Sequence, residues 1–296
     1  MKLIKPSFEI WEQPTGLEGV YKQIERVGRV CYKSEDKITE GSAKPFVDRM
    51  IKSGHGAMLE HGTVYLEFSD GFAGGFYPLR RKYEKNPYSR VKIVHSFMTG
   101  IDHIYVTTNL RVLVENGWLD DLKYICVPTE YHERRITVHF VCDRGVSHEF
   151  VRHRVMSFAQ ESTRYCNYSK DKFDNQITFI QPSWIILDKE IDSINELCLL
   201  AGQYDRENPN LRYLASLVDA NYTYILLLNK GWTPQQARAV LPNSLKTELI
   251  VTGFTSDWNH FFDLRARGTT GAPHPQAKEL AEPLMKEFIV RKYINN

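Results

Sequence analysis

The chain has 296 residues, 42% of them hydrophobic and 25% charged, which is the composition of an ordinary globular protein. Its formal net charge of +2 is too balanced for a general nucleic-acid coat or a polybasic membrane-binding surface. The five cysteines are odd in number, scattered and without a CxxC pair. This argues against a disulfide framework and a zinc ribbon, and it favours reduced thiols in the cytosol.

The N-terminus lacks the long apolar segment of a signal peptide. The longest strongly apolar run, Tyr224–Leu228, is too short to span a bilayer. We therefore expect a soluble, cytoplasmic protein that does not enter the membrane.

The N-terminal half alternates between strand and helix patterns. Strands are expected at 2–11, 63–68, 92–95, 103–106 and 136–142, and helices at 17–30, 44–53 and 109–116. Glycines and prolines make the rest of 70–135 irregular. We interpret about 70–135 as an insertion into one domain.

The C-terminal half is predicted to be mainly helical. Helices are expected at 145–158, 190–206, 211–229, 233–242, 244–252 and 256–265, with a strand at 177–180 and a last helix after the loop 268–275. Thr233, Pro234 and Gln236 have the spacing of a capping box with proline at the first helical position. Without repeats, low-complexity tracts or linkers, the chain is predicted to be one α+β domain over residues 1–296.

The densest polar segment reads RHRVMSFAQESTRY, from Arg152 to Tyr165. In a helix, steps of about 100° would fan Arg152, His153 and Arg154 over about 200°, too wide for one solvated face. The downstream hydroxyls lie beside Arg164, and hydroxyl and guanidinium donors suit phosphate recognition. The alternative is an exposed helix with ordinary surface arginines.

Other kinds of chemistry have weaker support. The sequence contains no Gly-rich dinucleotide fingerprint, P-loop, GxSxG or HExxH motif, and its histidines lack clustered cysteine partners, so no metal site is expected. Tyr77–Lys92 could stack bases and contact phosphates, although a solvated loop is the favoured interpretation. Cys166 could be a nucleophile near Arg164, but a buried structural thiol is favoured because no histidine base is adjacent.

Four blocks together carry a resemblance to a known family. They are RHR followed after seven residues by Ser162, Glu60-His61 before a strand, 237–242 (ARAVLP), and 262–265 (FDLR) with 272–276 (APHPQ) after it. In this order they resemble the flavin-dependent thymidylate synthases. The resemblance implies an antiparallel sheet packed with long helices.

The resemblance also implies an activity, which is methylation of dUMP to dTMP. Methylenetetrahydrofolate would be the carbon donor, NADPH the reductant and FAD the bound hydride carrier, without a cysteine nucleophile. It further implies a homotetramer whose active sites are shared between subunits. The runner-up is a catalytically altered relative that binds a nucleotide or RNA, although nucleic acid is not the favoured partner.

Carried over residue by residue, the family pattern assigns two groups of site residues, with Arg265 as the catalytic cation that faces uracil and favours ionisation at N3. The dUMP group is Glu149, Arg152, Gln160, Ser162, Thr163, Arg164, Arg238 and Arg265. The FAD group is His61, Thr63, Arg152, His153, Arg154, Gln160, His260 and His274.

Several positions depart from the family pattern. Glu149 stands where glutamine is common, Ala159 and Gln160 replace Asn-Glu, His260 replaces a frequent asparagine, and Ser256 replaces a frequent arginine. A carboxylate at 149 would repel a phosphate unless it pairs with Arg152, three residues on, or binds the sugar or base instead. The departures indicate a diverged subfamily.

Overall fold

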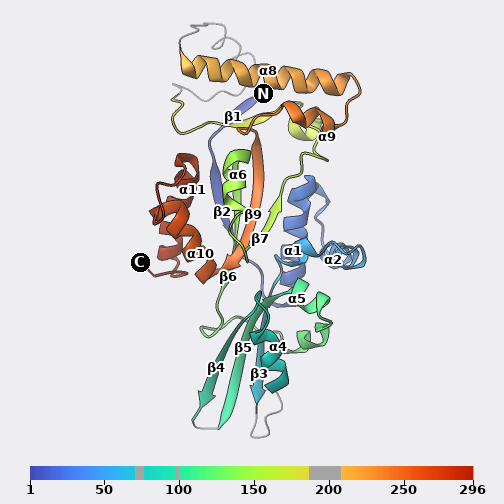
Figure 1. Cartoon of the computed structure of the whole chain (residues 1–296). Helices are drawn as coiled ribbons and strands as arrows, with labels where there is room; N and C mark the ends of the chain where they lie inside the picture. Colours follow the sequence, from blue (N-terminus) through green and yellow to red (C-terminus); the bar gives the residue numbers. More distant parts are fainter. Residues whose placement is uncertain (71–76, 98–99, 187–207, 296) are drawn as a thin grey trace.

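A computed structural model describes residues 1–70, 77–97, 100–186 and 208–295. The helix expected at 190–206 lies outside these residues. Figure 1 shows an elongated molecule, with a long helix and a small sheet at one end, a central sheet between helices, and a further sheet at the other end. The mixture of antiparallel sheets and helices confirms the predicted α+β class.

The central sheet positions most of the candidate site. Its order is β2-β6-β9-β7, all antiparallel, with bounds Ser7–Trp11, Arg135–Asp143, Lys246–Phe254 and Ser157–Gln160. Buried apolar side chains of β6 and β9 pack on one face against α6 (Arg144–Phe150), α10 (Thr255–Phe262) and α11 (Pro275–Val290). The other face packs against α1 (Gly16–Tyr32) through Val27, Val30 and Ile250. Because successive strand residues point to opposite faces, Leu249 and Val251 belong to the first core and Ile250 to the second.

The two ends carry separate small cores. At one end β1 (Lys2–Ile4) pairs in parallel with β8 (Thr178–Ile180) beneath α8 (Pro209–Asn229) and α9 (Pro234–Ala237). The strand expected at 2–11 is therefore two strands, β1 and β2, with Pro6 between them. Proline lacks the backbone N–H that a ladder needs, which is consistent with this break.

At the other end, the order β3-β5-β4 forms an antiparallel sheet, with bounds Thr63–Asp70, Ile101–Asn109 and Arg90–Ser96. Short helices contribute side chains to its hydrophobic core: α2 (Ala43–Lys52), α3 (Gly56–Leu59), α4 (Tyr77–Glu84) and α5 (Leu110–Glu115). Two strands from the segment 70–135 thus complete a sheet that β3 begins. The interpretation of this segment as an insertion, and of the chain as one domain, stays a prediction.

Two predicted helices are wrong. The helix expected at 145–158 ends at Phe150, and the chain turns through 151–155 into β7. The segment 244–252 mostly belongs to β9, where Ile250, Val251 and Thr252 lie in a strand buried on both faces. β-Branched side chains favour such a strand, and its long-range pairing with β6 overrides the local helical spacing.

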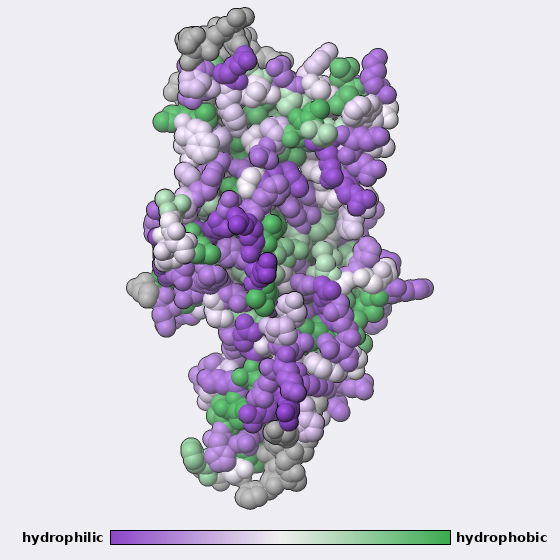
Figure 2. Space-filling view, in the orientation of Figure 1, coloured by the Kyte–Doolittle hydropathy of each residue, from purple (hydrophilic) through white to green (hydrophobic). Residues whose placement is uncertain are grey.

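Figure 2 shows hydrophilic side chains over most of the visible face, with hydrophobic ones gathered in smaller patches. Among the described residues, no helix is long and apolar enough to cross a bilayer.

Candidate active site

An open cleft of about 810 Å³ lies where the turn after α6 meets the segment after α10. It is lined by Glu149, Arg152, His153, Arg154, His260, Leu264, Arg265 and residues 270–274. Seven predicted site residues, counting His274, therefore share one cleft. Its charged side chains are three arginines and one glutamate, so the cleft has an excess of positive charge suited to anionic ligands.

Arg265 is the most constrained side chain of the cleft. It lies in a π-helical segment, Asp263–Arg267, a local geometry that is frequent at functional sites. Its Nε donates to His153 Nε2 at 3.1 Å, and one terminal nitrogen donates to the Glu149 backbone oxygen at 2.8 Å. The other terminal nitrogen makes an ion pair with the Glu149 carboxylate. These contacts fix the plane of the guanidinium.

His153 supports Arg265 as a neutral ring. Burial and the positive charges of Arg265, His260 and Arg152 lower its pKa to about 4. A neutral imidazole has one acceptor nitrogen, and the Arg265 contact requires that acceptor to be Nε2. His153 also packs against Phe261, with ring centroids 4.9 Å apart. The ring therefore couples the cleft to the hydrophobic core under α10.

The turn that carries the RHR residues contains a strained position. Val155 has φ 76°, a left-handed conformation that is unfavourable for a β-branched residue. This position lets the chain reverse and enter β7 with Arg152 and Arg154 exposed beside the cleft. Strain of this kind is typical of functional sites, where the surrounding structure maintains it.

The remaining predicted dUMP residues form a second group, away from the lining of the cleft. Gln160 at the end of β7 donates to Ser147 Oγ at 2.8 Å and to Thr247 Oγ1 at 3.2 Å. Arg238 donates to Thr163 Oγ1 at 3.1 Å. The backbone N–H of Ser162 donates to the Cys31 oxygen at 3.0 Å, while Arg164 is exposed. The loop after β7 is thus tied to α1 and to the segment after α9.

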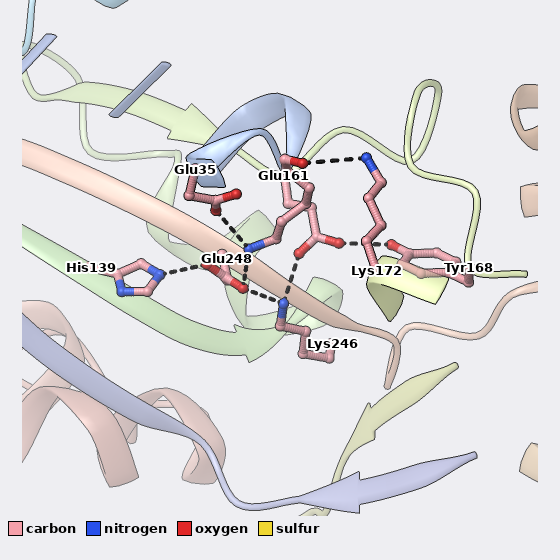
Figure 3. Close-up of polar contacts among 8 residues, drawn as sticks. Glu35, His139, Glu161, Tyr168, Lys172, Lys246 and Glu248 are labelled. Carbon is pink, nitrogen blue, oxygen red and sulfur yellow. Dashed lines mark hydrogen bonds and ion pairs between the residues drawn. The ribbon is translucent and has the colours of Figure 1, made fainter. Parts of the chain in front are cut away.

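A charged network lies directly beside this loop (Figure 3). Glu161, almost fully buried, pairs with Lys246 at 2.9 Å and accepts from the Tyr168 hydroxyl at 3.1 Å. Glu248 is shared by Lys246, Lys33 and His139, the last at 2.9 Å. Burial opposes ionisation of Glu248, but these partners lower its pKa below the usual range. Sequence reasoning missed this network because 244–252 was expected to be helical, although Lys246 and Glu248 stand two residues apart, the spacing that puts them on one face of a strand.

The two N-terminal residues predicted to contact FAD are buried. His61 is 0% exposed, and its Nδ1 lies 2.8 Å from Thr252 Oγ1. Burial and the charge of Arg135 lower the pKa of His61 to about 3. Arg135 also donates to Thr63 Oγ1 at 3.3 Å and to Ser157 Oγ at 3.1 Å.

These two residues and the cleft belong to opposite faces of the central sheet. His61 meets Thr252, whose side chain points the same way as Ile250 and hence toward α1. His153 contacts Phe261 in the core on the other face. The single chain therefore brings His153, His260 and His274 together but leaves His61 and Thr63 on the far side of the sheet.

The basic and aromatic segment Tyr77–Lys92 is α4 followed by a turn and the start of β4. Several of its cations have acidic partners: Arg80 with Glu84 at 2.7 Å, and Lys82 with Asp121 at 2.5 Å. Lys82 also lies 4.7 Å from the ring centre of Trp118. These pairings leave fewer free charges for a nucleic acid than the sequence alone suggests.

Comparison with known proteins shows which protein family this chain resembles. The model of the thymidylate synthase complementing protein family matches residues 130–291. A flavin-dependent thymidylate synthase of Mycolicibacterium vanbaalenii is 36% identical over 255 residues, which cover 85% of this chain and 70% of that protein. One of Pyrococcus furiosus is 31% identical over 124 residues, 42% of this chain, and the match spans less than half of that protein, 43%.

A solved structure is similar along nearly the whole chain but only loosely. It is the UMP/dUMP methylase PolB from Streptomyces cacaoi bound with 5-Br dUMP, with 17% identity and a TM-score of 0.43 over 98% of this chain and 93% of that one. The family match covers the central sheet from β6 onward, the cleft and the 160–164 loop. This chain belongs to the thymidylate synthase complementing protein family.

Proposed function

We propose that this protein is a flavin-dependent thymidylate synthase. It would methylate dUMP to dTMP with 5,10-methylenetetrahydrofolate as carbon donor and NADPH as reductant. Family membership supports the reaction class, because the curated relatives carry that name. The observation that carries the proposal for this chain is the guanidinium of Arg265, held in an arginine-rich cleft by a neutral His153 and by Glu149.

Arg265 would act electrostatically. A fixed cation beside the pyrimidine stabilises negative charge as it develops on the ring during the reaction. Because His153 has a pKa of about 4, it stays neutral near pH 7 and adds no competing positive charge next to Arg265. It serves as a positioning residue that accepts the Arg265 Nε–H.

The dUMP phosphate would be held by the loop after β7. Ser162, Thr163 and Arg164 supply hydroxyl and guanidinium donors there, and Arg238 joins them through its bond to Thr163. Gln160 is tied to Ser147 and Thr247, so its side chain would orient the loop as well as any ligand.

The cleft residues fit part of an FAD site. Arg152, Arg154, His260 and His274 are exposed donors in an open cleft, which suits the phosphates and polar edges of a dinucleotide. His61 and Thr63 do not fit direct contact within one chain, because both are buried. Bound FAD would carry the hydride that NADPH supplies.

The cysteines support a route without a thiolate nucleophile. Burial raises the pKa of Cys31 to about 11, of Cys126 to about 11 and of Cys166 to about 12, and it raises that of Cys142 as well. A thiol that stays protonated at neutral pH is a poor nucleophile. This statement covers the four cysteines in the described part of the chain, which excludes Cys198.

A homotetramer in the cytoplasm, with sites shared between subunits, completes the proposal. The distribution of FAD-type residues over both faces of the central sheet supports it. In a shared site, the eight residues of the FAD group would come from more than one subunit. One chain then need not bring all eight of them together.

The direct test is an absorbance spectrum of the purified protein with and without dUMP, followed by chromatographic measurement of dTMP. We expect a yellow protein whose flavin bands shift when dUMP binds. The Arg265→Ala variant should keep its flavin but form no dTMP. A colourless protein that also fails to take up added FAD would refute the proposal, and near-normal turnover by Arg265→Ala would show that another group acts on the ring.

A further inference from the structure

The ion pair between Glu149 and Arg265 changes what the cleft offers to a pyrimidine. An arginine side chain has five N–H groups in a planar fork. Three of the five are engaged here, by His153 Nε2, the Glu149 carboxylate and the Glu149 backbone oxygen. Among the residues that the structure describes, the other two N–H groups have no partner and remain for a ligand, and the guanidinium charge already has an anionic partner in Glu149.

Glu149 itself is accessible from the cleft. Its side chain is 33% exposed, against 14% for Arg265, and both line the cleft. Within the described part of the chain, one of its two carboxylate oxygens is engaged in the ion pair with Arg265, so the second remains able to accept a hydrogen bond. The pair therefore presents free N–H donors next to a free carboxylate acceptor.

The other charged and titratable groups that face this pair cannot take over the role of Glu149 as an anionic acceptor. The lining contains Arg152, Arg154, His153, His260 and His274, and no second carboxylate among the described lining residues. Ionisation of a bound ring beside Glu149 would place two negative charges close together, and a like charge disfavours the ionised form. A neutral ring has an N–H donor next to a carbonyl acceptor. It can therefore donate to Glu149 and accept from Arg265 without bringing two negative charges together.

We propose that Glu149 is a specificity-determining residue that makes the cleft bind a pyrimidine as its neutral, N3-protonated form, with the N3–H donated to Glu149 and a ring carbonyl accepting from Arg265. This rests on the proposed function, because it takes Arg265 to be the residue that faces the base. It differs from the expectation that Arg265 favours ionisation at N3, which would hold for an arginine without a carboxylate partner.

The test uses 5-fluoro-dUMP bound to the full-length, flavin-loaded protein. The ¹⁹F resonance of the bound nucleotide, followed from pH 6 to pH 10, gives the pKa of its N3, with the free nucleotide in the same buffer as reference. With the wild-type protein we expect an N3 pKa no lower than that of the free nucleotide. With Glu149→Gln the pKa should fall by at least about one unit, because Arg265 then faces the ring without its counter-ion.

Glu282→Gln is the matched control. It removes one carboxylate from an exposed site on α11, outside the lining of the cleft, and should give the wild-type N3 pKa. An N3 pKa lowered equally in the wild-type protein and in Glu149→Gln overturns the role of Glu149 alone. Failure of 5-fluoro-dUMP to bind either protein overturns the nucleotide site, and with it both this inference and the proposed function.

Discussion

Arg238 donates a hydrogen bond to Thr163 Oγ1 at 3.1 Å, across 75 positions of sequence. The bond joins the short segment after α9 to the loop after β7. Arg238 is exposed, so the rest of its guanidinium is open to solvent. The two residues thus form a preassembled donor pair at the place where we propose that the nucleotide phosphate binds.

Arg238→Ala should weaken binding of dUMP about 10- to 100-fold, since a hydrogen bond to a charged group contributes about 1.5–3 kcal/mol. Isothermal titration calorimetry at fixed salt measures the change. Lys230→Ala removes an exposed cation at the end of α8 and should bind dUMP as the wild-type protein does. Equal affinities of the wild-type protein and Arg238→Ala would mean that the phosphate lies elsewhere.

Val155 offers a test of backbone strain with a matched partner in the same turn. Val155 (φ 76°) and Val151 (φ −67°) are 38% and 39% exposed. Glycine relieves a left-handed conformation that costs an L-residue about 1–2 kcal/mol, whereas at Val151 it brings only flexibility. Val151→Gly should therefore lower the free energy of unfolding by about 1 kcal/mol, and Val155→Gly should leave it unchanged or raise it. Urea denaturation compares the two, and similar losses would count against strain at Val155.

Local signals in the sequence were sufficient where a short segment determines its own structure. The helix predicted at 109–116 starts at Asn109, and the Asn109 side chain accepts from the Val112 N–H at 3.1 Å at the start of α5. Glycine directly follows each of the helices predicted at 44–53 and 109–116, and both of these glycines, Gly54 and Gly117, have positive φ, near 70°. Helix caps and left-handed glycines depend only on neighbouring residues, so they can be predicted directly from the sequence.

Long-range pairing was not accessible in the same way. The Arg152–Arg154 turn exists because β7 pairs with β9, where Ser157 lies opposite Thr252. A local sequence pattern does not indicate a partner strand nearly a hundred residues away. The helical spacing of apolar residues in 145–158 therefore predicts a helix where the chain forms a turn and a strand. The family resemblance identified Arg265 and His153 as site residues, but the contact of Glu149 with Arg265 required the fold.

The buried pair of Glu161 and Lys246 should behave as one unit. Lys246→Met leaves Glu161, with a side chain 1% exposed, without its cation and should cost about 3 kcal/mol of unfolding free energy. Adding Glu161→Leu removes the stranded charge, so the double variant should lose less than the sum of the two single variants by more than about 1 kcal/mol. Lys286→Met, at an exposed position of α11, is the control, with little expected change. Additive losses in a double-mutant cycle would mean that the two side chains do not interact.

His61 should make the stability of the protein depend on pH. Its pKa is about 3 in the folded chain and near 6.5 when unfolded, so between these values the unfolded state binds more protons. Its contribution to stability is therefore present above about pH 6.5 and is lost as the pH falls toward 3. From pH 7 to pH 5 this one group should lower the free energy of unfolding by about 2 kcal/mol.

Chemical denaturation at pH 7 and pH 5 of the wild-type protein, His61→Asn and Thr252→Val separates this titration from a general loss of stability. His61→Asn should lose about 2 kcal/mol less than the wild-type protein between the two pH values, because the titrating ring is gone. Thr252→Val removes the hydrogen-bond partner of His61 but keeps the buried ring, so it should be less stable at both pH values and retain the pH dependence. If His61→Asn and the wild-type protein lose the same amount, the acid sensitivity belongs to other groups and His61 is not held neutral by its burial between β9 and Arg135.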